Sequence, residues 1–134
     1  MTMEMPRIRL GCDASWLELV QTGEDRWRVA ADWCSMLSAD FTAHLTGEEV
    51  ADFAERMLSH LRAPVASRFS VAVTPGRNNP LTLSAEPVQG GFAFYAFLTP
   101  NGDDLTCHLQ TEIGPIDADE LRDMCEALLA SLAL

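Results

Sequence analysis

The sequence predicts an α+β fold, in which a largely antiparallel sheet of about seven to eight short strands carries two amphipathic helices on one face. Two apolar stripes with helical spacing each follow a capping signal, and short runs of alternating apolar residues precede each stripe. Because each element must bury its apolar side, this order favours a two-layer domain with both helices on the sheet. The length of 134 residues fits one domain with one core.

The first part of the chain contains four strand-like runs, which are Arg7–Leu10, Ser15–Gln21, Arg26–Cys34 and Asp40–Leu45. The last two runs are apolar at odd positions and, apart from Ala30, polar or Cys at even positions, as expected for a hairpin with one buried face. A turn centred on Met36 keeps both apolar sets on that face. This register places Cys34 opposite Ser38 and His44 opposite Arg28.

Cys34 and His44 are the side chains of this hairpin that could act as nucleophile and base. In the predicted register they lie about 20 Å apart at the usual strand rise, whereas a base must be within hydrogen-bond reach. We therefore predict that the hairpin is scaffold. A pairing of Cys34 with His60 or His108 through the fold stays open, although the signatures of cysteine-enzyme families are absent.

The first helix begins after Thr46, which forms a capping box with Glu49. The helix is expected to end before Pro64, because proline disfavours the helical conformation of the preceding residue. Its predicted apolar stripe consists of Val50, Phe53, Ala54, Met57, Leu58 and Leu61.

The next segment reads as a meander of four antiparallel strands separated by the turn sequences PGRNNP and QGG. The third of these strands is apolar at nearly every position, which indicates a strand covered on both faces or central in its sheet. The alternating residues place the strands at Phe69–Val73, Leu81–Ala85, Phe92–Leu98 and Leu105–Ile113.

The second helix begins at Asp117, with Glu120 three residues on. Its stripe repeats the first at a constant offset, and it consists of Leu121, Met124, Cys125, Leu128, Leu129 and Leu132. We predict a single domain over residues 1–134, with a possible pseudo-repeat of four strands and a helix over 1–63 and 68–134. The alternative is that any two capped amphipathic helices converge on such a pattern.

The charge of the chain is strongly acidic, because 20 Asp and Glu residues face 9 basic residues and give a net charge of −11. Affinity for nucleic acids and anionic membranes comes from cationic side chains, so both partners are disfavoured. A basic protein would instead be attracted. The alternative is that acidity only keeps the protein soluble. All nine cations are arginine, which we interpret as the codon usage of a GC-rich bacterial genome.

The sequence predicts no catalytic, metal or cofactor site. It lacks P-loop, dinucleotide-binding, nucleophile-elbow and zinc-protease motifs. Cys107 and His108 are adjacent in a predicted strand, so their side chains point to opposite faces and cannot share one zinc ion. Arg77 could meet a carboxylate or an anion, but a solvated turn residue is favoured. Cys125 is interpreted as a buried thiol of the helix stripe.

The cellular compartment is predicted to be the cytoplasm. No apolar run is long enough for a transmembrane helix, and residues 1–13 lack the apolar centre of a secretory signal. The cysteines show no CxxC spacing and are predicted to be free thiols.

Carboxylates recur on one face of each helix, and we take them as the candidate partner-binding residues: Glu48, Asp52, Glu55, Asp119, Asp123 and Glu126. Paired carboxylates of glycoside hydrolases converge across a cleft, whereas these point outward. The face is either simply solvated or a docking surface for a basic protein.

The TGEE-capped helix with VxxFxxxMLxxL, followed by a meander and the helix DADELxxMCxxLLxxL, resembles small uncharacterised domains of actinobacteria. Some of those domains look like immunity proteins of polymorphic toxin systems. The resemblance implies a non-catalytic inhibitor that binds one toxin. The leading hypothesis is therefore a protein-binding module of immunity or chaperone type. One alternative is a small-molecule binder or enzyme with a sheet pocket near Trp33, Tyr95 and His108. The other is a structural protein that self-associates through a sheet edge or exposed aromatic side chains. The sequence leaves the oligomeric state open between monomer and homodimer.

Overall fold

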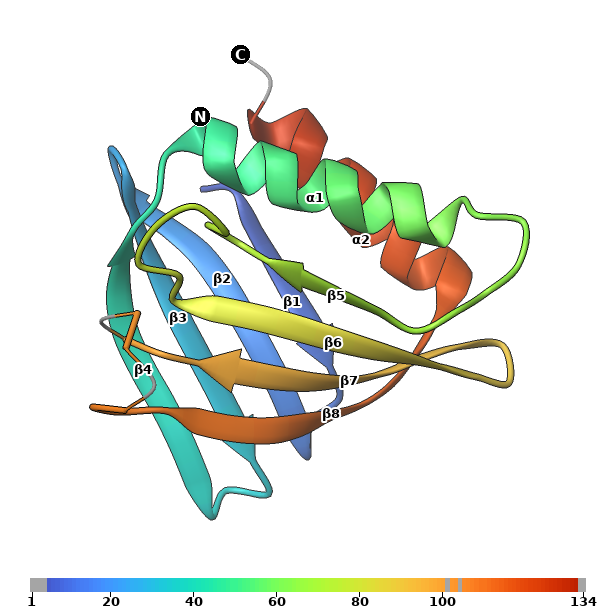
Figure 1. Cartoon of the computed structure of the whole chain (residues 1–134), viewed down its shortest axis with the longest axis horizontal. Helices are drawn as coiled ribbons and strands as arrows, with labels where there is room; N and C mark the ends of the chain where they lie inside the picture. The colour runs from blue at the N-terminus through green and yellow to red at the C-terminus, as the bar shows by residue number, and fades with distance from the viewer. Residues whose placement is uncertain (1–4, 101, 104, 133–134) are drawn as a thin grey trace.

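The computed structural model describes residues 5–100, 102–103 and 105–132, and the α+β class is confirmed. Within these residues the chain forms four strands and a helix, and then repeats that order (Figure 1). Residues 1–4, which belong to the segment considered for a secretory signal, lie outside this description. The elements are β1 (Arg7–Gly11), β2 (Ser15–Gly23), β3 (Arg26–Trp33), β4 (Leu37–His44), α1 (Gly47–Leu61), β5 (Phe69–Ala72), β6 (Leu81–Val88), β7 (Gly91–Leu98), β8 (Leu109–Asp117) and α2 (Ala118–Leu132).

The eight strands divide into two antiparallel sheets of four, each a meander in chain order, β1-β2-β3-β4 and β5-β6-β7-β8. Antiparallel pairing and helices packed against the sheets were expected; the division of the strands into two sheets was not. Pairing inside a meander is set by short turns, whereas nothing local in the sequence specifies whether β4 continues into β5. Helix α1 stands between these two strands in the chain, and the second sheet starts anew after it.

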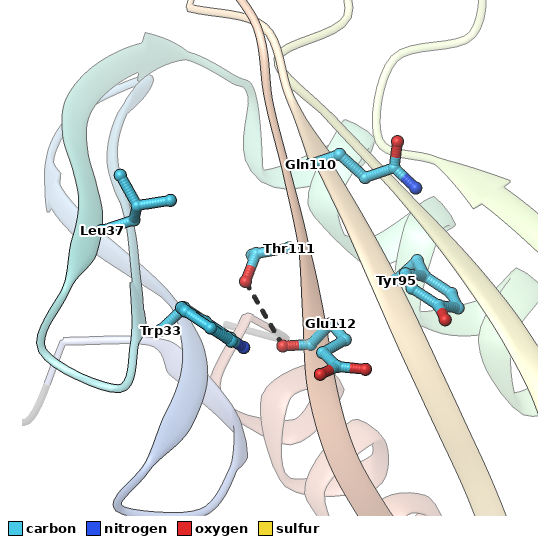
Figure 2. A pocket seen from close by; sticks show the side chains of 6 residues that line it. All are labelled: Trp33, Leu37, Tyr95, Gln110, Thr111 and Glu112. Carbon is cyan, nitrogen blue, oxygen red and sulfur yellow. Dashed lines mark hydrogen bonds between the residues drawn. The ribbon is translucent and has the colours of Figure 1, made fainter.

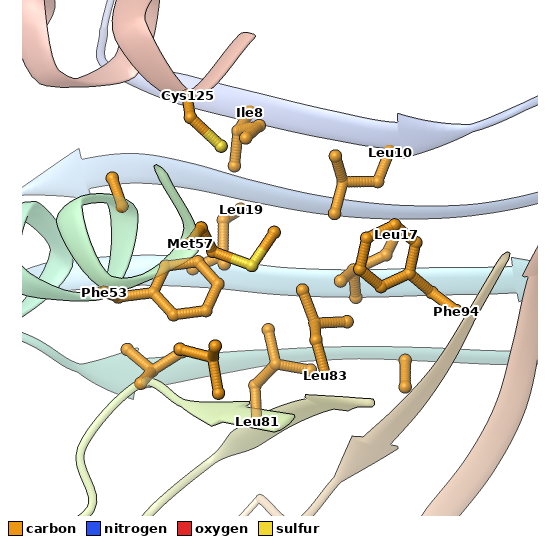
Figure 3. Close-up of a cluster of buried hydrophobic side chains, with 14 of the residues drawn as sticks. Ile8, Leu10, Leu17, Leu19, Phe53, Met57, Leu81, Leu83, Phe94 and Cys125 are labelled. Atoms are coloured by element: carbon orange, nitrogen blue, oxygen red, sulfur yellow. The ribbon is translucent and has the colours of Figure 1, made fainter. Parts of the chain in front are cut away.

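One hydrophobic core joins both sheets and both helices. Figure 3 shows leucines of β1, β2 and β6 meeting Phe94 of β7, with Phe53 and Met57 of α1 and Cys125 of α2 at the helical side. Trp27 and Val29 of β3 are fully buried in the same core. Fully burying one Leu or Phe side chain contributes about 1.5–3 kcal/mol, so the shared core is the main force that holds the two halves together.

Both helix starts form as the sequence predicts. The Thr46 hydroxyl accepts from the Glu49 amide at 3.1 Å, and the Glu49 carboxylate accepts from the Thr46 amide at 2.9 Å. At α2 the Asp117 carboxylate accepts from the amides of Asp119 and Glu120 at 3.0 and 3.2 Å. The predicted stripes are buried or half-buried against the core. Neither of the helices in the described ranges combines the length and apolarity needed to span a membrane.

The β3–β4 register differs from the predicted one. Trp33 pairs with Leu37 and Arg26 pairs with His44, so the turn is centred on Ser35, and the Met36-centred turn is wrong. Cys34 and Ser35 adopt left-handed conformations with φ of 52° and 57°. Both registers keep the same residues on the core side. Cys34 lies in the turn and His44 at the far end of the hairpin, so the two do not form a dyad within it.

Strands β7 and β8 differ in part from their predicted burial and bounds. β7 is central, between β6 and β8, but its outer face is open, because Tyr95 is 44% and Phe97 is 36% exposed. Covering on both faces is therefore excluded. β8 begins at Leu109 rather than Leu105, and Leu105 and Cys107 lie exposed in the preceding connection.

Candidate functional site

The six candidate carboxylates of the helices are all exposed. The two helices contact each other and lie side by side along the same side of the two sheets (Figure 1). Three of the carboxylates have arginine partners, namely Asp52 with Arg56 at 2.9 Å, Asp119 with Arg122 at 2.6 Å and Glu126 with Arg62 at 3.9 Å. Glu48, Glu55 and Asp123 make no hydrogen bond or ion pair with the described residues.

The helical layer, defined here as residues 47–62 and 117–132, is more acidic than the rest of the chain. Its three cations are Arg56, Arg62 and Arg122. Its nine acids are Glu48, Glu49, Asp52, Glu55, Asp117, Asp119, Glu120, Asp123 and Glu126. More than half of the net charge of −11 therefore lies on this layer.

A hollow of about 410 Å³ lies beside the start of α1, between the helix and the β5–β6 loop. The helix contributes Glu48, Glu49 and Asp52 to its wall, and the loop contributes Val73 to Arg77. Among the described residues, this lining contains three carboxylates and one cation, Arg77. The helical layer therefore borders a concave site in which part of its negative charge lines the wall.

Arg77 closes one side of this hollow; its side chain is 47% exposed, as expected for a turn residue, and it also pairs with a carboxylate. Its guanidinium donates to both carboxylate oxygens of Glu49, with Nε to Oε2 at 2.8 Å, and Nη2 also donates to the His44 carbonyl at 2.8 Å. Hydrogen bonding by Arg77 lowers the pKa of Glu49 below its ordinary value; burial opposes this shift, and the Thr46 amide assists it. Glu49 is thus paired with Arg77, and Asp52 is paired with Arg56, so Glu48 is the acid of this hollow that makes no ion pair with the described residues.

The outer face of the first sheet carries a second charged cluster, which is internally paired. Glu18 lies 3.7 to 4.0 Å from Arg7, Arg9 and Arg28. Arg28 also forms a two-pronged pair with Asp40 at 2.8 and 2.7 Å, which raises the pKa of Arg28 and lowers that of Asp40. Since the arginines of this face are engaged locally, they do not neutralise the helical layer.

A further hollow of about 370 Å³ lies where β8 faces the end of the β3–β4 hairpin (Figure 2). Its lining residues are Trp33, Leu37, Tyr95, Gln110, Thr111 and Glu112. Trp33 and Tyr95 were expected to share a sheet pocket, and they do, but His108 is not among the lining residues. The β8 residues were missed, because only the register that sets Tyr95 opposite Glu112 reveals them.

The cysteines and histidines are dispersed. Cys12, Cys34 and Cys107 are exposed thiols, while Cys125 is buried. Burial, with a smaller effect of the Glu126 charge, raises the pKa of the Cys125 thiol to about 12. His60 stacks on Phe69 with ring centroids 4.4 Å apart. Over the described ranges, no three His, Cys, Asp or Glu side chains gather as metal ligands would.

Comparison of the chain with protein-family models, with curated protein sequences and with solved structures finds no match. Among the surfaces of the described residues, the helical layer combines the most charge with an adjoining hollow.

Proposed function

We propose that this chain is a non-catalytic protein-binding module, of immunity or chaperone type, whose helical layer docks a basic protein in the bacterial cytoplasm. The observation that carries the proposal is the exposure of all six helix carboxylates on two adjacent helices, next to a hollow lined by Glu48 and Asp52. The resemblance to immunity-like domains agrees with an acidic inhibitor of a basic toxin.

Charge complementarity gives this surface a defined physical role. An acidic face attracts a basic partner over distances up to the Debye length, about 8 to 10 Å near physiological salt, and raises the association rate. Arginine pairs on the helices reduce the charge of Asp52, Asp119 and Glu126 without burying them. Glu48, Glu55 and Asp123 are therefore expected to dominate the attraction, and binding should weaken as salt rises.

The test is affinity capture from the source lysate at low ionic strength, with the retained proteins identified by mass spectrometry. The variant Glu48→Gln/Asp52→Asn/Glu55→Gln removes three negative charges from α1. The matched control Asp13→Asn/Glu24→Gln/Asp25→Asn removes the same charge from exposed positions off the helices. We expect a basic protein that the wild type and the control retain, that the helix variant loses, and that salt releases.

Two results would contradict the proposal. Equal loss of the partner by the control would show that only net charge matters. Recovery of no basic protein at low ionic strength would remove the reason for an acidic docking surface.

The two alternative functions each have one supporting observation. A small-molecule binder is favoured by the hollow between Trp33 and Tyr95. Self-association is favoured by β4, an eight-residue edge strand that, within the described residues, pairs with β3 and with no second strand. Neither involves the helical layer, so each can be tested separately from the leading proposal.

A further inference from the structure

The hollow at the β8 edge of the second sheet has a composition unlike that of the helical layer. It measures about 370 Å³ and is bounded by two aromatic side chains, Trp33 at the end of β3 and Tyr95 on the outer face of β7. Figure 2 shows Trp33 and Leu37 on one side of β8 and Tyr95 on the other, with Glu112 between them. The walls thus come from both sheets.

The backbone of Glu112 is hydrogen-bonded to the first sheet, while its side chain is exposed. Its backbone carbonyl accepts from the hydroxyl of Ser15, which is 7% exposed and belongs to the first sheet. Its side chain is exposed and makes no hydrogen bond or ion pair with the described residues. By contrast, Glu86 on the same sheet pairs with Arg68 at 2.7 Å, and Glu49 is held by Arg77.

Tyr95 faces Glu112 directly across the β7–β8 ladder. Opposed residues of an antiparallel pair have Cβ atoms about 4.5 to 5.5 Å apart, so the ring and the carboxylate border the same space. The ring is 44% exposed, because it lies on the open outer face of β7. A neighbouring hollow of about 450 Å³ is lined by the same three residues, Trp33, Tyr95 and Glu112, among others.

We propose that this hollow binds an organic cation, a guanidinium or alkylammonium group, with its charge against the Glu112 carboxylate and its apolar part against Trp33 and Tyr95. Aromatic faces attract cations through their negative quadrupole, and the attraction strengthens when the cation is partly desolvated. An anion would be repelled by Glu112. A hard metal ion would need several oxygen ligands, and the described residues provide no such group here. The site uses none of the helix carboxylates and is independent of the proposed function.

The experiment is a titration of the ¹⁵N-labelled protein followed by NMR, read at the Trp33 indole N–H and the Glu112 amide. Trp33→Phe assigns the indole signal among the three tryptophans of the chain. The probes are tetramethylammonium chloride, as a free small cation, and acetyl-Gly-Arg-Gly-amide, as a protein arginine. The corresponding citrulline peptide is the neutral match of the arginine peptide, and sodium chloride controls for ionic strength.

We expect saturable shifts at both signals with the cationic probes and none with the citrulline peptide. Glu112→Gln should weaken binding of the arginine peptide about tenfold, as loss of a charged hydrogen-bond partner does. It should also weaken binding of tetramethylammonium, which donates no hydrogen bond, because the attraction between the two charges is lost. Glu24→Gln, which removes one carboxylate in the β2–β3 turn, should leave binding unchanged, and so should the α1 triple variant. Tighter binding of the arginine peptide would assign the site to a protein side chain, and tighter binding of tetramethylammonium would assign it to a free small molecule.

Three outcomes would overturn the inference. The first is the absence of saturable shifts at Trp33 with either cation. The second is equal binding of the citrulline and arginine peptides, which would mean that the charge is irrelevant. The third is equal weakening by Glu112→Gln and Glu24→Gln, which would reduce the effect to net charge. None of these results bears on the helical layer, so the two proposals fail separately.

Discussion

At the scale of single residues, Arg77 links the two halves of the chain through its side chain. It reaches from the β5–β6 loop to the capping box of α1 and to the last carbonyl of β4. A solvated turn arginine is the common case, and the sequence PGRNNP contains nothing that distinguishes a clamp. The distinguishing information is three-dimensional, because Glu49 becomes a neighbour only once the second sheet lies against the first.

Arg77→Ala is expected to lower the free energy of unfolding by about 1 kcal/mol, since a two-pronged, partly exposed pair and one carbonyl contact are lost. Arg77→Lys keeps the positive charge but cannot make the two-pronged contact. Its free energy of unfolding should therefore lie between those of the wild type and Arg77→Ala. Urea denaturation measures both. The control is Arg68→Ala, whose pair with Glu86 is at least half exposed on both sides and should contribute little. An equal loss in the control would contradict a special role for Arg77.

The Arg77–Glu49 pair also predicts that the free energy of unfolding depends on pH. The pKa of Glu49 is lowered in the folded state, so its contribution is complete above the ordinary glutamate value of 4.5 and is lost as the pH falls through the lowered pKa. The difference in unfolding free energy between the wild type and Arg77→Ala should be constant from neutral pH to about pH 5 and shrink below it. Denaturation at a series of pH values measures this. A difference that grows on acidification would refute the assignment.

Thiol reactivity tests the burial of Cys125. A thiol whose pKa is raised to about 12 by burial has almost no thiolate at neutral pH and no access for a reagent. Titration with Ellman's reagent should therefore modify the three exposed cysteines of the native protein and the fourth only after denaturant is added. Cys125→Ala should remove only the thiol equivalent that appears after denaturant is added. Four fast equivalents in the native state would show that α2 does not cover this thiol.

At the scale of elements, the helices were predictable and the sheets only partly so. Caps and stripes depend on residues a few positions apart, so Thr46 and Asp117 mark the starts correctly. The β3–β4 face was predictable because its period of two survives a shift of the turn by one residue. The turn itself was not, since Cys34 and Ser35 adopt left-handed conformations that their residue types do not signal. Glu112 was missed because its neighbour Tyr95 is distant in the sequence and comes close only through strand pairing. The contact of Arg77 with Glu49 is non-local in the same way.

Strand β4 presents an open edge with a definite pattern. The Leu45 amide donates to the Asp25 carbonyl at 3.2 Å, so odd residues of β4 point their backbone groups at β3. Even residues then point outward, which agrees with the His44 carbonyl accepting from Arg77. The free backbone groups of this edge therefore belong to Ser38, Asp40 and Thr42.

Amide hydrogen exchange should follow this alternation. We expect fast exchange at Ser38, Asp40 and Thr42, and slow exchange at Ala39, Phe41 and Ala43, as measured by NMR on a dilute sample. If the protein self-associates through this edge, the three fast amides become protected as the concentration rises. Uniform protection of β4 in a dilute monomer would refute the assigned edge.

At the scale of the whole molecule, a shared core predicts a single cooperative transition. The three tryptophans, Trp16, Trp27 and Trp33, all lie in the first half, so their fluorescence reports on that half alone. Far-ultraviolet circular dichroism reports on both halves. Because residues of both sheets and both helices form one cluster, the two signals should give the same urea midpoint. Separate midpoints would indicate halves that unfold independently.

The segment that connects the two halves contributes nothing to the shared core. Residues 62–68 are exposed throughout and lie outside every helix and strand. Buried side chains and polar contacts, including those of Arg77 and Ser15, join the halves, while the peptide bonds of the connection raise the effective concentration of one half near the other. We expect a chain cut in this connection to give two ββββα fragments that reassociate through their apolar sides. Fused to two other proteins, such fragments would report the proximity of those proteins by reassembling.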